Sequence, residues 1–168
     1  MLVSVVIEVP EFIVSRAAEL GIDIEREFLE YIINRLCLDP KMEMKIHLDL
    51  ARKFLDEGKR LADKDPIQAS EKLYKATEEA IKALAICLNL SEVLSKVNTK
   101  GRWTITDLET AVRVLKRSIG KIVMNAWDHA WYLHVMGFHE AKLDREGVKE
   151  RIEPIEDLIR KALETCSM

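Results

Sequence analysis

Apolar residues recur at intervals of three and four along most of this chain, which is the spacing that amphipathic helices require. The clearest pattern lies between Pro66 and Leu88. Asp65 can cap this helix, and proline fits its first turn because no hydrogen-bond donor is lost there. Further helices are predicted at about 41–64, from the capping-box sequence Thr106–Glu109 to about Ser118, at 121–138, and after Asp144, where Pro154 predicts a kink or a later start. Residues 91–103 are predicted to be the main connection, since Asn98 and Gly101 interrupt them.

The first 38 residues follow a different pattern. Leu2–Val9 is apolar and rich in β-branched side chains, which predicts a short strand. Pro10 and Asp23 then begin two helices, and Gly21 separates them. We therefore predict a strand-helix-helix extension over residues 1–38, and over residues 39–168 an all-α, antiparallel, up-and-down bundle of about four or five helices.

Composition excludes several classes of protein. Hydrophobic residues make up 48% and charged residues 33% of the 168 residues, which is typical of a compact chain and not of a disordered one. The net charge of -3 gives no overall attraction to nucleic acid. Leu2–Val9 is too short to cross a membrane and contains Glu8, so we predict a cytoplasmic protein with no membrane partner.

The three cysteines, Cys37, Cys87 and Cys166, are far apart in the sequence and form no CxxC pair. Their odd number argues against a disulfide framework. Cys37 and Cys87 fall on apolar helix faces, which predicts buried free thiols in a reducing compartment.

Residues 125–143 concentrate groups that can carry chemistry, including three of the four histidines and two of the three tryptophans. On a helix, His134 points into the bundle core or into a cleft, with Trp131 beside it. Its best partner is an acid from the Pro66–Leu88 helix, because a buried imidazole needs hydrogen bonds. Charged side chains cluster there: Glu71, Lys75, Glu78, Glu79 and Lys82. Either His134 or His139 is a general acid-base group, or His134 is a core histidine that keeps two helices in register; the second interpretation is favoured because a tuned pKa requires a specific geometry.

The histidine spacing argues against a metal site. His129, His134 and His139 follow one another at intervals of five residues, which separates their side chains by about 140° around an α-helix. Zinc-binding pairs on helices use intervals of three or four. We predict no metal and no cofactor.

Two charged segments each have two interpretations. The lysines of residues 71–82 (EKLYKATEEAIK) suit phosphate, but opposite charges four residues apart are more typical of a solvated, stabilising helix face, and that reading is favoured. Lys100-Gly101-Arg102-Trp103 places a cation beside an aromatic ring. This sequence suits stacking on a base or anchoring of a loop, and anchoring is favoured for a lone tryptophan.

The opening, Val3–Arg35, resembles a ribbon-helix-helix element, in which strands pair between two chains. DNA readers of that type need polar or basic side chains at alternate strand positions. Those positions hold Ser4, Val6 and Glu8, and Glu8 would repel phosphate. We therefore predict a dimerisation or docking arm and not a DNA reader.

Three separated segments carry a further resemblance. They are HLDLARKFLDEGKRLADKDPIQASEKLYKATEEAIKALA (His47–Ala85), KGRWT (Lys100–Thr104) and AWDHAWYLHVMGFHEAKLDREGV (Ala126–Val148). In this order they resemble the archaeal PaREP paralogue family, which is grouped with the HEPN-like helical bundles. The resemblance covers roughly residues 39–163 and implies a HEPN-like bundle that forms a homodimer or a higher homo-oligomer.

Proteins of the HEPN-like group include ribonucleases and toxins, and others that assist nucleotidyltransferases by binding nucleotide or substrate. The ribonuclease subset places an arginine before a histidine, with four to six residues between them. Before His134 those positions hold Trp127, Asp128 and His129, and no arginine precedes His139 at that spacing either. The cation expected to stabilise the reacting phosphate is therefore absent, and ribonuclease activity by the usual route is not expected.

The leading hypothesis is a homo-oligomeric binding module with a cleft for a nucleotide or small anion between helices 66–88 and 121–138. The predicted ligand-binding residues are Lys75, Glu78, Glu79, Trp103, Trp131, His134 and His139. His134 and His139 would supply hydrogen bonds, Trp131 a stacking surface and Lys75 a charge. A nucleotide or RNA is the predicted ligand, and a nucleotidyltransferase is a predicted partner. The alternatives are a toxin-type ribonuclease that uses His134 or His139 without the usual arginine, and a purely structural interaction protein.

Overall fold

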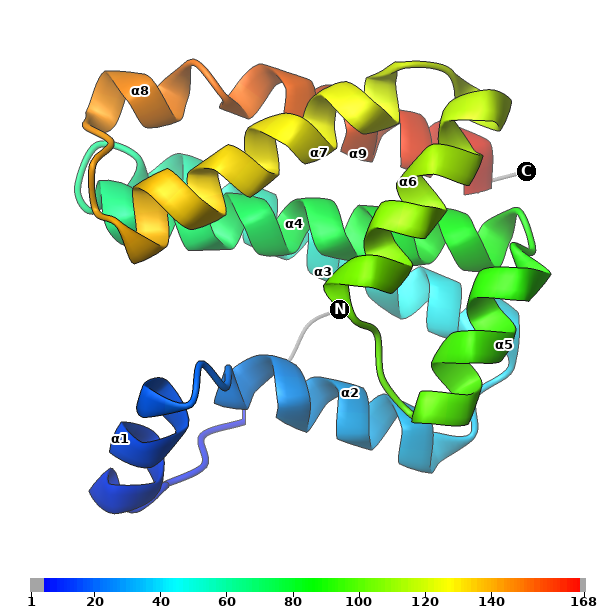
Figure 1. The fold of residues 1–168 in the computed structure, drawn as a ribbon, viewed down its shortest axis with the longest axis horizontal. Coiled ribbons are helices and arrows are strands. Elements are labelled where there is room, and N and C mark those ends of the chain that lie inside the picture. Colours follow the sequence, from blue (N-terminus) through cyan, green and yellow to red (C-terminus); the bar gives the residue numbers. More distant parts are fainter. Residues whose placement is uncertain (1–4, 167–168) are drawn as a thin grey trace. The chain divides into compact units, whose positions relative to one another are not determined.

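The computed structural model describes residues 5–166, and the chain divides into two compact units, Met1–Leu38 and Asp39–Met168. The described residues fold into helices and contain no strand. The prediction of an all-α chain is confirmed, and Figure 1 shows the arrangement of the helices within each unit.

The first unit consists of helices α1 (Glu11–Glu19) and α2 (Ile24–Leu36). Both predicted helices are confirmed, and the Asp23 carboxylate caps α2 by accepting a hydrogen bond from the Arg26 amide. The predicted strand is wrong over Val5–Val9, while Leu2–Ser4 lies outside the described residues. A β-patterned segment forms a strand only beside another extended segment, and the described part of this chain offers none.

The second unit is a helical bundle built around α4. Its elements are α3 (Pro40–Leu61), α4 (Pro66–Cys87), α5 (Ser91–Lys100), α6 (Ile105–Ile119), α7 (Ile122–Tyr132), the π-helix η1 (Leu133–His139), α8 (Arg145–Lys149) and α9 (Ile152–Cys166). Helix α4 runs through the middle of the unit and packs against α3, α9, η1, α6 and α7 (Figure 1). The short link at residues 62–65 folds α3 back along α4.

Proline and aspartate set several boundaries as predicted. Asp65 accepts a hydrogen bond from the Gln68 amide at the start of α4, and Asp144 accepts one from the Gly147 amide at the start of α8. The helical segment that contains Pro154 is interrupted after Lys149 and restarts at Ile152, so proline occupies the first turn of α9, where it leaves no donor unpaired.

Two local predictions were wrong. The predicted connection 91–103 is helical up to Lys100, and Gly101 ends the helix in a left-handed conformation (φ 70°). The capping box lies two residues before the predicted one. Thr104 and Asp107 exchange side-chain to backbone hydrogen bonds, so the hydroxyl and carboxylate that satisfy the first turn of α6 come from positions 104 and 107.

Charged side chains on α4 are buried, which contradicts the predicted solvated face. Lys75, Glu78, Glu79 and Lys82 are all less than 9% exposed. The apolar side of the same helix is buried as well, with Leu73 and Ile81 fully enclosed. Helices pack around α4 on several sides, so charge spacing alone could not identify a solvent-facing side.

The cysteines also depart from expectation. Cys87 at the end of α4 and Cys166 at the end of α9 form a disulfide, with their Cα atoms 5.8 Å apart. Cys37 is a free thiol, but it is exposed. The prediction of buried free thiols at Cys37 and Cys87 is therefore wrong. The reason is tertiary: the ends of two helices separated by 79 residues in sequence meet in the bundle.

Over the described range, the helices are too short or too polar to cross a membrane.

Candidate functional site

The histidine site joins η1 to α4. His134 lies on η1, and its Nδ1 atom is 2.8 Å from Oε2 of Glu71 on α4. The His134 side chain is 17% exposed and that of Glu71 is 12% exposed, so solvent reaches both only in part. The predicted contact between His134 and an acid of the 66–88 helix is confirmed, with Glu71 as the acid.

A change in helix type brings a second histidine into the site. Rings five residues apart diverge on an α-helix, which was the argument against a metal site, although His134 and His139 were both placed in the predicted cleft. Residues Leu133–His139 form a π-helix, in which the backbone bonds join residues five apart. Residues at that interval therefore stack along the axis. His139 Nε2 lies 3.1 Å from His134 Nε2, and the side chain of His139 is exposed.

Aromatic rings surround His134. Tyr74 of α4 stacks on the imidazole with ring centres 4.1 Å apart, and Phe138 lies on η1 with its ring centre 6.1 Å away. Trp131 is 5.8 Å from His134 between ring centres and remains 38% exposed. A partly exposed indole thus lies beside the histidine pair.

Close packing of η1 on α4 holds this arrangement. A Cβ atom added to Gly137 would lie 2.6 Å from Cβ of Ser70, which is well inside van der Waals contact. Only glycine permits the η1 backbone to approach the Ser70 side chain so closely here. The short separation places His134 within hydrogen-bonding reach of Glu71.

The donor and the acceptor of each hydrogen bond between Glu71, His134 and His139 can be assigned from their chemistry. A carboxylate can only accept, so the Nδ1–H of His134 donates to Glu71. In a neutral His134 the Nε2 atom is then the acceptor, and Nε2–H of His139 donates to it. This leaves Nδ1 of the exposed His139 as an acceptor. The chain Glu71–His134–His139 thus links a carboxylate to a solvent-accessible imidazole.

The other predicted site residues lie elsewhere or act through neighbours. Glu78 accepts a hydrogen bond from the Tyr74 hydroxyl at 3.0 Å, and the Tyr74 ring in turn stacks on His134. The ammonium of Lys75 lies 5.8 Å from the ring centre of Phe54 on α3. Trp103 is half-buried between α5 and α6 and is not among the rings that contact His134 in the described chain.

Glu79 belongs to a separate, buried network. Its carboxylate lies 2.6 Å from Nδ1 of His47 on α3 and accepts a hydrogen bond from Lys82 Nζ at 2.8 Å. Burial raises the pKa of this carboxyl group, but the charge of Lys82 and then His47 outweigh burial and lower the pKa to about 2. The carboxylate therefore stays ionised inside the bundle.

The contribution of His47 was not predicted. It lies on the α3 face that also carries Leu50, Ala51 and Phe54, all buried. A histidine at an apolar position of an amphipathic helix, with an acid available on the neighbouring helix, was the signal that could have revealed the pair.

Within residues 5–166, no group of three His, Cys, Asp or Glu side chains is arranged to hold a metal ion. The arrangement offers the Nδ1 atom of the exposed His139, whose imidazole is linked through His134 to the Glu71 carboxylate, and the partly exposed indole of Trp131. These groups suit recognition of an anion carrying an aromatic group, or transfer of a proton at His139.

The model of the archaeal PaREP1/PaREP8 family matches residues 46–159. This chain belongs to that family. The resemblance to the PaREP proteins is thereby confirmed, and the matched residues include both the histidine site and the buried Glu79 network. Among curated proteins, no sequence matches the chain.

Solved structures support the same assignment. A crystal structure of a protein from Sulfolobus solfataricus is 37% identical, with a TM-score of 0.58, and the match covers 73% of this chain and 95% of that one. A solution structure of the Orf c02003 protein, the same structural-genomics target, is 40% identical, with a TM-score of 0.62, and the match covers 69% of this chain and 90% of that one. This PaREP1/PaREP8 chain therefore shares its helical fold with them.

Proposed function

We propose that this PaREP1/PaREP8 protein is a binding module that recognises a nucleotide or another small anion at the histidine site. The observation that carries the proposal is the hydrogen-bonded chain from Glu71 through His134 to the exposed His139. In its protonated form His139 can donate its Nδ1–H to an oxyanion while its Nε2–H still donates to His134. Glu71 would hold His134 in the orientation required.

Two neighbours support a nucleotide as the ligand class. Trp131 is partly exposed beside His134, and an indole is a good stacking surface for a base. Lys75 follows Glu71 by one helical turn on α4, and its ammonium lies 5.8 Å from the ring centre of Phe54 on α3, so its charge would attract the phosphate without touching it. The phosphate would contact the imidazoles and the base would cover Trp131.

The wider biological setting is part of the same proposal. The bundle would be of HEPN-like type, would act in the cytoplasm as a homo-oligomer, and would serve a nucleotidyltransferase or an RNA-handling partner. All-helical architecture and membership of the PaREP1/PaREP8 family support this setting.

Thermal unfolding in the presence of ligands tests the histidine site. Inorganic phosphate, AMP and ATP should each raise the Tm of the wild type, because they bind only the folded state. In His134→Ala and His139→Ala, the ligand concentration needed to reach the same rise in Tm should be at least about tenfold higher. His129→Ala is the matched control, since His129 is on α7 and outside the chain from Glu71 to His139. If no anion shifts the wild-type Tm, or if all three variants respond alike, the site does not bind anions.

One observation favours a second candidate, a ribonuclease with a rearranged site. A carboxylate that orients one imidazole, which in turn contacts an exposed imidazole, is an arrangement that can move a proton to or from a ribose hydroxyl. Purified protein incubated with RNA should then cleave it, and His139→Ala should remove the activity while His129→Ala retains it. Equal cleavage by the wild type and His139→Ala would indicate a contaminating nuclease.

The third alternative, a purely structural role for His134, is tested by His134→Leu. It predicts unchanged partner binding and little loss of stability, because a leucine can fill the space beside Tyr74 and Phe138 and solvent reaches the Glu71 side chain, which is 12% exposed.

A further inference from the structure

The N-terminal unit has a large apolar surface and almost no core of its own. Ala17 is the only buried residue in its described part, and α2 buries none. Large apolar side chains that are 37% to 89% exposed are Val5, Val6, Ile7, Phe12, Ile13, Val14, Leu20, Ile22, Phe28, Tyr31, Ile32 and Leu36. Together they expose on the order of 1,000 Å², more than the roughly 300–600 Å² of the largest patch on a typical monomer.

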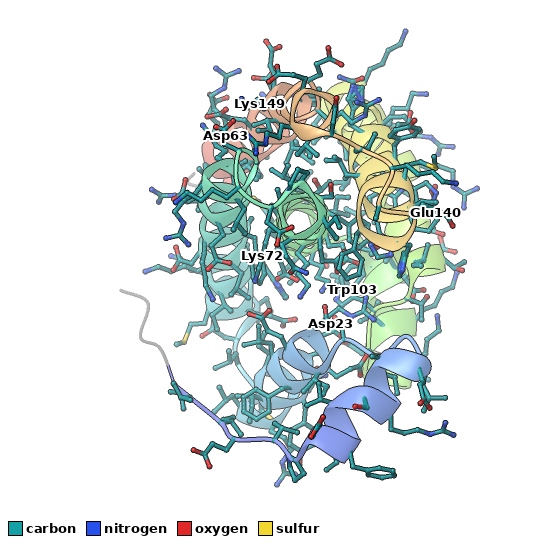
Figure 2. The ribbon with its side chains drawn as sticks, turned by 90° about the vertical axis from the view of Figure 1, so that its left-hand side faces the viewer. Asp23, Asp63, Lys72, Trp103, Glu140 and Lys149 are labelled. Atoms are coloured by element: carbon teal, nitrogen blue, oxygen red, sulfur yellow. A yellow bond between two sulfur atoms is a disulfide. The ribbon has the colours of Figure 1, made fainter. Side chains whose placement is uncertain are left out.

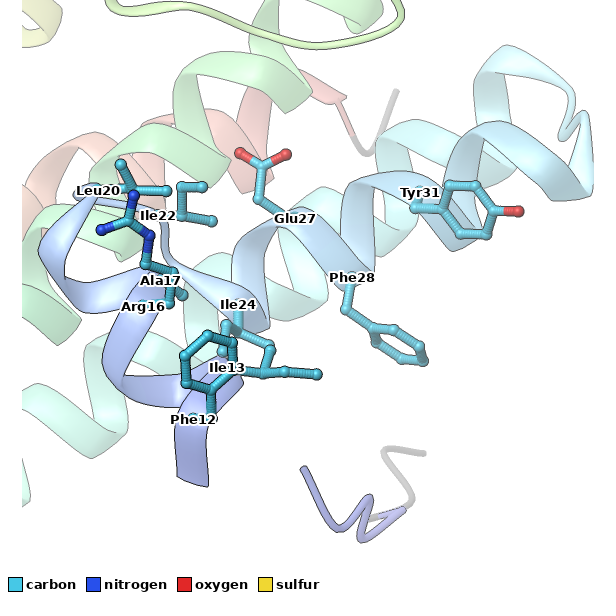
Figure 3. A pocket seen from close by; sticks show the side chains of 10 residues that line it. All are labelled: Phe12, Ile13, Arg16, Ala17, Leu20, Ile22, Ile24, Glu27, Phe28 and Tyr31. Carbon is cyan, nitrogen blue, oxygen red and sulfur yellow. The ribbon is translucent and has the colours of Figure 1, made fainter. Parts of the chain in front are cut away.

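Part of this surface is a shaped groove. It has a volume of about 610 Å³ and is lined by α1, by α2 and by the turn between them. Figure 3 shows Phe12 and Ile13 of α1 and Phe28 of α2 along it. Its charged lining residues are Arg16 and Glu27, so the groove carries one charge of each sign.

The segment before α1 adds a second unsatisfied feature. Val5–Val9 is apolar apart from Glu8, and Val5, Val6 and Ile7 are each more than half exposed. Within the described residues, no backbone hydrogen bond joins this segment to another part of the chain. An extended β-branched segment of this kind is stabilised by pairing with another extended segment.

We propose that the α1–α2 groove and the segment Val5–Val9 form an interface with the same surface of a second copy of this chain. This inference deepens the homo-oligomer of the proposed function by naming the surface that joins the copies. In a two-fold arrangement each copy offers the other an identical unpaired segment and an identical groove. The exposed apolar area is comparable to the roughly 800 Å² that each partner buries in an interface of standard size.

Charge supports a second copy over other occupants. Arg16 bonds Glu19 and Glu27 lies near Arg26 within one chain, but all four side chains remain solvent-accessible. A two-fold axis can in addition place Arg16 of one copy against Glu27 of the other, so the groove is complementary to itself. The described part of this unit carries seven acidic and three basic residues. This excess of negative charge disfavours nucleic acid and an anionic lipid surface as occupants.

Exchange of the two charges provides the sharpest test, with molar mass measured by light scattering across a dilution series of the full chain. The wild type should be a dimer, and Arg16→Glu and Glu27→Arg should each raise the dissociation constant at least about tenfold, because each homodimer then faces like charges twice. Mixing the two variants should restore the dimer, since every contact in the mixed dimer again pairs opposite charges. Restoration by mixing requires two copies and cannot arise from contacts within one chain.

A matched pair of apolar substitutions tests the groove itself. Phe12→Asp and Ile67→Asp each place aspartate at the second residue of a helix, where a negative charge is favourable. Phe12 is 77% exposed in the N-terminal unit and Ile67 is 38% exposed in the bundle. Phe12→Asp should weaken the dimer at least about tenfold and Ile67→Asp should leave it unchanged, with circular dichroism confirming equal helix content.

Each result decides something different. A wild type that stays monomeric at all concentrations overturns the self-association together with this surface. A dimer that survives Phe12→Asp and both unmixed charge variants overturns this surface only, and the homo-oligomer then forms elsewhere. The response of the histidine site to phosphate or AMP is measured separately and is unaffected by either outcome, because its residues lie on α4 and η1. If Phe12→Asp unfolds the unit, mixing the charge variants still decides the question.

Discussion

Helix α4 and the α1–α2 unit distribute charged and apolar residues in opposite ways. Helix α4 buries Glu79 and Lys82, whereas the α1–α2 unit exposes Phe12 and Phe28. On α4, each buried charge of the Glu79 network has an opposite charge or an imidazole within hydrogen-bonding distance. In the α1–α2 unit, the apolar side chains have few neighbours of their own unit. Residue type alone therefore does not decide burial; the partners that the fold supplies do.

The largest expected effect is on the buried network. Glu79→Gln keeps the shape of the side chain but removes the negative charge that bonds Lys82 and the ionic bond to His47. We expect the free energy of unfolding to fall by about 3–5 kcal/mol, as for the loss of one partner of a buried pair. Urea denaturation measures it. Glu146→Gln is the control, because that side chain is exposed and should change the value by less than about 0.5 kcal/mol. Equal losses of stability in both variants would contradict the claim that the buried Glu79 carboxylate stabilises the bundle through Lys82 and His47.

Acid should weaken the same network. The folded pKa of Glu79 is lowered to about 2 from the ordinary value of 4.5. Its ionised form therefore contributes stability above about pH 4.5, and this contribution is lost as the pH falls from 4.5 toward 2. The difference corresponds to about 3 kcal/mol. Unfolding measured across this range should show a steeper loss in the wild type than in Glu79→Gln. Parallel curves would show that the carboxylate does not titrate as described.

Close packing of η1 on α4 predicts a smaller effect. Gly137→Ala places a methyl group against Ser70, and we expect a loss of about 1–3 kcal/mol together with a weaker response of the histidine site to anions. Adding Ser70→Gly removes the opposing atoms. The double variant should lose less stability than the sum of the two single variants. Simple additivity would mean that the two residues do not contact each other.

The smallest effect is expected in the N-terminal unit. Phe28 is 45% exposed. Phe28→Ser should therefore change the free energy of unfolding of the bundle by less than about 0.5 kcal/mol, measured at protein concentrations at which the chain is monomeric. Leu73→Ala in α4, where the side chain is fully buried, should cost about 2–5 kcal/mol. A large effect of Phe28→Ser in the monomer would show that this surface is already covered within one chain.

Much of the bundle was predictable because its signals are local. The Asp-Pro pairs at 39–40 and 65–66 mark the starts of α3 and α4, and the three-and-four spacing marks their apolar faces. The family resemblance rested on the same segments. The site was predicted in part: His134 does meet an acid on α4, but the partner is Glu71, and Glu79 binds His47 instead.

Sequence alone determined where most helices begin, which family the chain belongs to, and that a histidine on one helix would face acids on another. These features depend on residues close together in the chain. Tertiary structure decided the rest, because it depends on which helices meet. The π-helix that brings His139 to His134 coincides with the close approach of Gly137 to Ser70. The burial of the α4 charges needs several surrounding helices. The Cys87–Cys166 disulfide forms because two helix ends meet in the bundle.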